Sequence, residues 1–395
     1  MRQITNFFSI RSENRLKIDL ILLSTGFILL MIGMVMVSSA SIAIADDQHG
    51  DPFFFLKKQF LAALIGCCAA FIGMVIPIRT WKNLSLPLLL LGITLLIIVF
   101  IPDIGRTVNG STRWISVAGI NFQVSEPARL CLLIYVAGYL VRRNRQLRES
   151  ISGFIPPIII LCIACGLLLF EPDYGASVVL LLSIMPMLFS AGARIRDFTI
   201  FVAISMIGMT VIAFLTPERI ERLYTFLEPW EYSQQGGFQL TQSLIAFGRG
   251  DWFGVGLGNG VQKLFYLPEV HTDFIFAVLV EELGLFGALV MILLFTILVI
   301  RIFQIALKAA RLERLFEAYL SIGIGSWLAI QTCINIGVNI GALPTKGLTL
   351  PLISYGRSSL IITIIAIGMI LRISHEISGQ NLNQKRASLK KTEVS

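Results

Sequence analysis

The sequence predicts an all-α, polytopic membrane protein with about ten transmembrane helices. Of its 395 residues, 55% are hydrophobic and 14% are charged, and the mean hydropathy is +0.80, so the chain is far more apolar than a typical soluble domain. Apolar runs with almost no charge recur along it, each long enough to cross a hydrocarbon core of roughly 30 Å. Helices are expected because the strands of a membrane barrel would be shorter and would alternate apolar and polar residues.

Ten apolar runs define the expected spans. The first run is about 20 residues long and lacks a small-residue cleavage site, so it is expected to be a membrane helix and not a cleaved signal peptide. The fourth is short, follows Glu126 and contains Arg129. The spans cover residues 20–40, 60–78, 84–101, 127–141, 151–170, 174–193, 198–215, 274–300, 318–338 and 350–371.

The distribution of basic residues predicts that both termini are cytoplasmic. With that orientation, the cytoplasmic segments contain 21 of the 32 Lys and Arg residues and the outer loops contain nine. Such an excess is typical of the cytoplasmic side of a membrane protein. The asymmetry and the anionic lipid of the inner face explain the net charge of +8, which therefore does not indicate nucleic-acid binding. We expect a multi-pass protein of the cytoplasmic (inner) membrane.

The chain divides into two tails and one transmembrane domain. Residues 1–19 form a short basic N-terminal tail, 20–373 the transmembrane domain, and 374–395 a C-terminal tail whose Gln, Asn and Lys content predicts disorder. One large extracytoplasmic loop, residues 216–273, joins helices 7 and 8 and is too long to be only a connection. Its segments PERIERLYTFLEPW and GFQLTQSLIAFGRG are expected to be helical and to form an interfacial or re-entrant lid.

The cysteines do not indicate a disulfide framework or a metal site. All six lie within the expected spans, where cysteine behaves as a small buried apolar residue. They are Cys67, Cys68, Cys131, Cys162, Cys165 and Cys333.

The stretch YLPEVHTDFIFAVLVEELG contains the main candidate for chemistry. Asp273 lies at the expected start of a spanning helix, which places an ionisable group beside the lipid headgroups and within reach of water and an amphiphilic substrate. Thr272 and Asp273 are also ordinary N-cap residues, so a purely structural role stays open. Glu281 and Glu282 lie roughly 12 to 14 Å deeper along the same helix and must face the bundle or a cavity, as expected for a proton-coupled transporter or for an enzyme with a polar groove.

Two further pairs of residues are candidates for substrate contact. Arg113 and Trp114 are adjacent in an outer loop and could hold a phosphate and a sugar ring, or serve as an interfacial cation and aromatic. Glu126 and Arg129 have the i, i+3 spacing that brings side chains together on one face of a helix. A charged pair at membrane depth is costly, which indicates either a structural role inside the bundle or a contact with substrate.

Several motifs in order resemble the SEDS family (shape, elongation, division and sporulation), most closely its cell-division branch. They are DPFFF, RW at Arg113 and Trp114, GFQLTQSLIAFGRG, GVGLGNGVQKLFYLPEVHTDFIFAVLVEELG and LPTKGLTLPLISYG. The resemblance implies a ten-helix glycosyltransferase that joins lipid II into a nascent glycan strand of peptidoglycan at the outer face of the membrane, at the division septum. It also implies a partner, a class B penicillin-binding protein (an FtsI-like transpeptidase), together with other division proteins.

The resemblance also assigns roles to residues. Asp273 matches the family's essential outer-face aspartate, and an inverting glycosyl transfer needs one base to deprotonate the attacking hydroxyl. The diphosphate leaving group needs cations. Lys346, in the family's PTKG motif, is the best candidate, with Arg113, Lys263 and Arg249 as others, and a divalent cation (Mg²⁺ or Mn²⁺) could share the task.

Two positions depart from the family pattern. The family motif Q-P-S-E-x-x-K reads QVSEPAR here, so Glu126 is kept and Arg129 replaces a lysine, while SYGGSS reads SYGRSS and places Arg357 where the family has glycine. Two other functions remain as alternatives: a transporter that flips lipid II, for which charged intramembrane residues would be the signature, and a non-catalytic scaffold of the division site.

Overall fold

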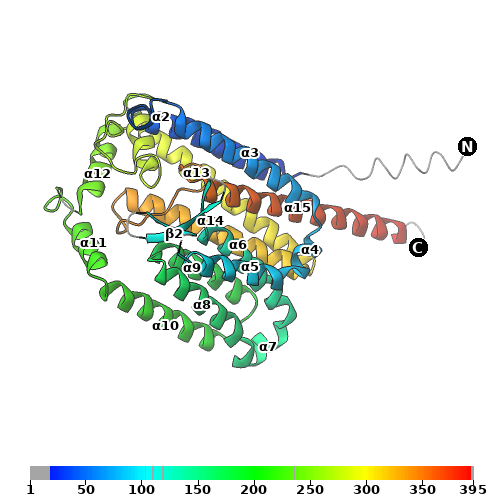
Figure 1. The fold of residues 1–395 in the computed structure, drawn as a ribbon. Coiled ribbons are helices and arrows are strands. Elements are labelled where there is room, and N and C mark those ends of the chain that lie inside the picture. The colour runs from blue at the N-terminus through cyan, green and yellow to red at the C-terminus, as the bar shows by residue number, and fades with distance from the viewer. Residues whose placement is uncertain (1–17, 103, 109–110, 118–119, 235, 393–395) are drawn as a thin grey trace, which may run out of the picture.

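The structure is a computed structural model that describes residues 18–392 except 103, 109–110, 118–119 and 235 (Figure 1). Ten long helices form one bundle, and each expected span overlaps one of them. They are α2 (Leu20–His49), α3 (Phe54–Val75), α5 (Ser85–Ile98), α6 (Ser125–Arg142), α8 (Ile155–Phe170), α9 (Tyr174–Ser190), α10 (Ile195–Phe214), α13 (Ile275–Arg311), α14 (Leu315–Asn339) and α15 (Arg357–Thr392). Short helices α4 (Ile78–Asn83) and α7 (Asn144–Glu149) and a 3-10 turn (Ile151–Gly153) complete one end.

Seven helices within the described part of the chain are long and apolar enough to cross a membrane. They are α2, α3, α8 with the 3-10 turn before it, α10, α13, α14 and α15. Helices α5 and α9 are apolar but shorter, and α6 carries the charged residues Glu126, Arg129 and Arg142. The chain is therefore a helical, polytopic membrane protein, and ten as the number of spans stays a prediction.

Helices α6 and α14 lie at the centre of the bundle and α10 lies at its edge. Every residue of α6 from Ala128 to Leu140 is buried, and α14 contacts α6, α9 and α13. By contrast, Asp197 and Phe201 are the buried residues of α10. Figure 1 shows α10 and α11 along the outside of the molecule, where α10 has apolar side chains to present to lipid.

A small sheet that the sequence did not predict interrupts the helical fold. Strands β1 (Gly105–Val108), β2 (Ser111–Val117) and β3 (Ile120–Gln123) form an antiparallel sheet in the order β1-β2-β3. Trp114 pairs with Arg106 on one side and with Gln123 on the other. The physical reason lies in the β-branched and aromatic residues of the segment STRWISV, which favour a strand.

The large loop before α13 contains the two helices that its sequence predicted. They are α11 (Pro217–Leu227) and α12 (Phe238–Gly250), and α12 packs on α13 with Leu240 and Ala246 buried. The C-terminal residues differ from their prediction. Where disorder was expected from residue 374, α15 continues as one helix to Thr392 (Figure 1).

Helix α13 is broken at Gly284, and the preceding glycine-rich loop fills the break. Gly284 has a φ of 71°, and a Cβ there would lie 2.4 Å from the amide nitrogen of Gly254. The amides of Val255 and Gly256 donate to the carbonyls of Glu281 and Glu282 at 3.0 and 3.1 Å. The amides of Leu285 and Phe286 donate to the carbonyls of Asp251 and Trp252 at 2.9 and 3.1 Å. The loop therefore satisfies the backbone groups that the break frees.

Candidate active site around Asp273

Asp273 lies in the turn immediately before α13 and does not cap that helix. The N-cap residue is Phe274, which has no side chain able to accept a bond from the first turn. Thr272 turns away, because its hydroxyl donates to the carbonyl and carboxylate of Glu269 at 3.1 and 2.8 Å. Within the described part of the chain the Asp273 carboxylate has no hydrogen-bond partner. The structural alternative for Asp273, a helix cap, is therefore wrong.

The surroundings of Asp273 suit a base that works near neutral pH. Burial, and next the nearby charge of Glu269, raise the pKa of Asp273 to about 7, while Arg113 and Arg222 act in the opposite direction. A carboxylate with such a pKa accepts a proton more readily than an ordinary aspartate and is still deprotonated in part at neutral pH.

Three amide side chains on α14, which we call the amide row, hold Asp273 and the PTKG segment together. Gln331, Asn335 and Asn339 are spaced four residues apart and are buried. Asn335 and Asn339 donate to the Asp273 carbonyl at 2.9 and 3.0 Å. Asn335 also donates to the Leu348 carbonyl at 2.7 Å, and Gln331 donates to the Thr349 carbonyl at 2.9 Å.

The PTKG segment consequently passes beside the Asp273 carboxylate. A Cβ added to Gly347 would lie 3.5 Å from Oδ2 of Asp273. This glycine adjoins Lys346, the cation that the sequence analysis favoured. The base candidate and the segment of the cation candidate thus meet at one end of the bundle, although Lys346 lies 73 positions after Asp273 in the sequence.

Lys346 lines a cationic cavity with two arginines of α11. The cavity has a volume of about 150 Å³, and its lining includes Tyr174, Arg219, Arg222 and Lys346. The Lys346 ammonium lies 4.2 Å from the centre of the Tyr174 ring, and the Arg219 guanidinium lies 4.8 Å from it. Burial, followed by the charges of Arg222 and Arg219, lowers the pKa of Lys346 to about 8. Cations this close repel one another, so the cavity is electrostatically suited to an anionic group.

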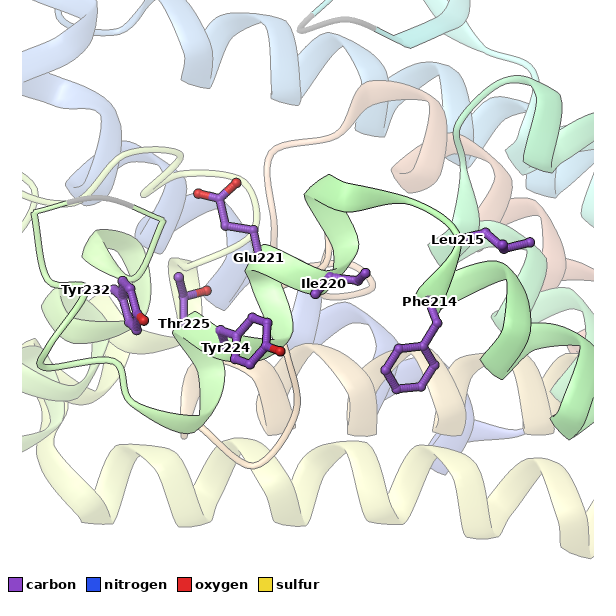
Figure 2. A pocket seen from close by; sticks show the side chains of 7 residues that line it. All are labelled: Phe214, Leu215, Ile220, Glu221, Tyr224, Thr225 and Tyr232. Atoms are coloured by element: carbon purple, nitrogen blue, oxygen red, sulfur yellow. The ribbon is translucent and has the colours of Figure 1, made fainter.

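A second and larger cavity adjoins the cationic one. It has a volume of about 380 Å³ and lies between the end of α10 and α11. Figure 2 shows its lining, in which Phe214, Leu215, Ile220 and Tyr224 provide apolar and aromatic surface. Phe214 and Ile220 line both cavities, so the two are neighbours.

Arg113 fixes the sheet to the turn between α8 and α9. Its guanidinium donates to the carbonyls of Glu171 and Pro172 at 3.3 and 2.7 Å and lies 4.0 Å from the Asp173 carboxylate. The Glu171 carboxylate is buried and has no hydrogen-bond partner among the residues that the structure describes. Burial together with the charge of Asp173 raises its pKa to about 8. Trp114 follows Arg113 on β2 and is partly exposed.

Glu126 and Arg129 form a buried pair at the back of the amide row. Arg129 donates to Glu126 at 3.2 Å and to Oε1 of Gln331 at 3.0 Å. The indole of Trp327 donates to the same oxygen at 2.6 Å, and the Arg129 guanidinium lies 5.1 Å from that ring. The structure therefore links this pair to the site through Gln331.

Lys263 and Arg249 pair with the two acidic residues that precede the break of α13. The ammonium of Lys263 is buried and donates to Glu282 at 2.7 Å, to Ser39 at 2.9 Å and to the Gly258 carbonyl at 2.6 Å. Arg249 lies 3.3 Å from Glu281, whose carboxylate also accepts from the amides of Val261 and Gln262 at 3.0 and 3.1 Å. The two acidic residues expected to face a cavity or the bundle thus hold the glycine-rich loop in place.

Other motifs converge on the Asp273 turn through an aromatic cluster. The rings of Phe55, His271 and Tyr355 are 4.6 to 5.4 Å apart, and the Tyr355 amide donates to the His271 carbonyl at 2.8 Å. The segments DPFFF, EVHTD and LISYG therefore meet at one place. Arg357 is the first residue of α15 and is partly exposed.

The sequence analysis missed the amide row, Tyr174, Arg219 and Arg222. The row had a signal in the segment QTCINIGVN, where amides recur every four residues and so lie on one helical face. The two arginines had none, because only the folded position of α11 brings them to Lys346.

The comparisons with known proteins agree with this arrangement. A family model described as cell cycle protein, which bears the names of FtsW, RodA and SpoVE, matches residues 20–379. The chain belongs to this family. A probable peptidoglycan glycosyltransferase FtsW of Nitrosococcus halophilus is 49% identical over 358 residues, which cover 91% of this chain and 92% of that protein. The protein of the same description from Legionella pneumophila is 48% identical over 361 residues, covering 91% and 92%. The resemblance to the SEDS family is confirmed.

Two solved structures share the fold. A chain from a study of polymerization and crosslinking by a peptidoglycan synthase complex has a TM-score of 0.74 and 27% identity, covering 92% of this chain and 99% of that one. The rod shape determining protein RodA of Thermus thermophilus has a TM-score of 0.68 and 26% identity, covering 91% and 98%.

Proposed function

We propose that the chain is a peptidoglycan glycosyltransferase that polymerises lipid II during septal cell-wall synthesis, with Asp273 as the general base. The family and the activity printed for its relatives support the reaction class. The single observation that carries the site assignment is the Asp273 carboxylate, which has no hydrogen-bond partner among the described residues and lies beside the PTKG segment. A free carboxylate at this depth costs stability and therefore indicates a function.

In this mechanism Asp273 takes the proton of the attacking sugar hydroxyl. The bond from the anomeric carbon to the diphosphate breaks as the new glycosidic bond forms, so the configuration at that carbon inverts. One base is sufficient, because a diphosphate leaves as an anion and needs little protonation. Burial of Asp273 raises its pKa to about 7, which increases its basicity while part of the population stays deprotonated at neutral pH.

The charge that develops on the leaving diphosphate would be balanced by Lys346, Arg219 and Arg222. These cations share one cavity, and the neighbouring apolar cavity at Phe214 and Ile220 suits the first part of a lipid chain. The described residues include no group of three or more His, Cys, Asp or Glu placed to hold a metal ion. A divalent cation that enters with the diphosphate could add to the same charge balance.

The membrane arrangement and the partner belong to the same proposal. Ten spans, cytoplasmic termini and a location in the inner membrane at the division site would place Asp273 on the outer face, where lipid II is polymerised. A related chain was solved in a study of a peptidoglycan synthase complex that polymerises and crosslinks. A class B penicillin-binding protein is therefore the proposed partner, since polymerised strands must then be crosslinked.

Glycan-strand formation from labelled lipid II, by the purified protein with its class B partner, tests the proposal. Wild type should form polymer and Asp273→Asn should not, while both bind the partner. Glu228→Gln is the matched control: it removes an exposed carboxylate of the same outer loop that does not act on the pKa of Asp273, and it should polymerise at the wild-type rate. Normal polymerisation by Asp273→Asn would overturn the base assignment. Movement of lipid II across vesicles without polymer, by wild type, would favour the transporter alternative.

A further inference from the structure

A third cavity lies at the end of α13 that is farthest from Asp273. It has a volume of about 310 Å³ and is formed by the last turns of α13, by α15 and by Asp19, the N-cap residue of α2. The positive-inside distribution assigns this end of the bundle to the cytoplasmic leaflet. The cavity is thus separate from the candidate active site.

An ion pair forms the polar floor of this cavity. Nε of Arg301 lies 3.0 Å from both carboxylate oxygens of Asp19, and its Nη2 lies 2.9 Å from Oδ2. The Ser374 hydroxyl donates to the same carboxylate at 3.3 Å, and Nη1 of Arg301 donates to Gln304 at 2.8 Å. Arg301 and Asp19 therefore neutralise each other and leave no charge for a ligand to balance.

Two other cations line the cavity without a neutralising partner. Lys308 and Arg311 are exposed, and within the described part of the chain their side chains have no ion pair or hydrogen bond. Lys308 follows Arg301 by seven residues and Arg311 follows Lys308 by three, spacings that place all three on one side of α13. The adjacent cations Arg314 and Arg372 differ, because both pair with Glu376. The cavity is left with two uncompensated positive charges.

The remaining walls are apolar. Ile305 and Leu312 of α13 and Ile377 of α15 line the cavity, and the Ser378 hydroxyl lies among them. Cations beside apolar walls at a membrane surface match an amphiphile that carries one negative charge above a hydrocarbon part.

We propose that this cavity binds the phosphodiester headgroup of an anionic phospholipid of the cytoplasmic leaflet. Lys308 and Arg311 contact the phosphate oxygens, and Ile305, Leu312 and Ile377 contact the glycerol and the first methylenes of the acyl chains. Arg and Lys are the side chains that recognise phosphate, and the leaflet that this end faces is rich in anionic lipid. The site would hold the cytoplasmic ends of α2, α13 and α15 against one lipid.

Native mass spectrometry of the full-length protein in detergent, titrated with phosphatidylglycerol, tests this assignment. Wild type should bind it saturably, and phosphatidylcholine should bind far more weakly. Lys308→Gln with Arg311→Gln should weaken the affinity for phosphatidylglycerol roughly 30-fold, from the contribution of two basic residues near a membrane surface. Competition by inorganic phosphate separates the two sources of a phosphate group: displacement of the lipid by millimolar phosphate would overturn the lipid assignment.

Three further variants separate the cavity from the general charge of this face. Arg79→Gln with Lys82→Gln removes two cations of α4 that lie outside the cavity and should leave the affinity within a few-fold of wild type. Ser378→Trp keeps every charge but fills the cavity and should abolish saturable binding. Lys308→Arg keeps the charge and should retain binding even if the glutamine variant does not fold. An equal loss from the α4 variant, or unchanged binding by Ser378→Trp, would overturn the proposal.

Discussion

Replacing Asn335 by alanine tests whether the amide row positions the catalytic groups. The Asn335 amide donates two hydrogen bonds, to the carbonyls of Asp273 at 2.9 Å and of Leu348 at 2.7 Å. A typical hydrogen bond contributes about 1 kcal/mol net, so the two together contribute about 2 kcal/mol to holding the base beside the PTKG segment. If all of this energy is lost in the transition state, the polymerisation rate falls by roughly 30-fold. The expected loss lies between several-fold and that limit.

The assay is the initial rate of glycan-strand formation from labelled lipid II, with the class B partner present. Thr332→Val is the matched control, because Thr332 is also buried on α14 and no described residue forms a hydrogen bond with its hydroxyl. It should polymerise at the wild-type rate. The reasoning is refuted if Asn335→Ala also does so, or if Thr332→Val loses as much activity, since the effect would then be a general loosening of the bundle.

Three other perturbations have defined outcomes. In a pH profile of initial rates, activity should rise as pH passes about 7, where Asp273 loses its proton, and fall above about 8, where Lys346 loses its charge. Lys346→Arg should keep activity to higher pH, because arginine stays charged there. Gly284→Ala should lower the midpoint of thermal unfolding, because alanine is strained at a φ of 71° and its Cβ would meet backbone atoms. Gly208→Ala in α10 should leave the midpoint unchanged, because a Cβ there meets no atom within 4 Å. Lys263→Met should destabilise the protein by roughly 3–5 kcal/mol in denaturant unfolding, because Glu282 is then buried without a partner, and adding Glu282→Gln should restore part of this loss. Equal midpoints for the two glycine variants, a flat pH profile, or a Lys263→Met variant as stable as wild type would each contradict the corresponding argument.

The helices were predictable because a membrane requires long apolar runs, which hydropathy reads directly. The ends of the helices were less predictable. Helix α13 extends to Arg311 and α15 to Thr392, because a helix can continue beyond the hydrocarbon core of the membrane. The break at Gly284 was not predictable, since one glycine in an apolar run is compatible with a straight helix. Its cause is a contact with Gly254, which lies 30 positions earlier in the chain.

The same limit applies to the site. Asp273 could be singled out because a carboxylate at the edge of a span is rare, but the choice between a base and a helix cap needed the observation that Phe274 occupies the cap position. The sequence analysis named Lys346, Lys263 and Arg249 as candidate cations because all three are basic residues of the outer loops. Only the fold separates Lys346, which shares a cavity with Arg219, from the two cations that pair with acidic residues of α13.

The broken helix α13 has a consequence for the order of assembly. In an uninterrupted helix the amides of Leu285 and Phe286 would donate to the carbonyls of Glu281 and Glu282, which are the four groups that the glycine-rich loop engages. Before the loop docks, these groups can pair with one another, so α13 can enter the membrane as a straight helix with no peptide group exposed to lipid. Docking then exchanges two helical bonds for four bonds to the loop, and Gly284 is the residue at which the chain can turn to permit the exchange.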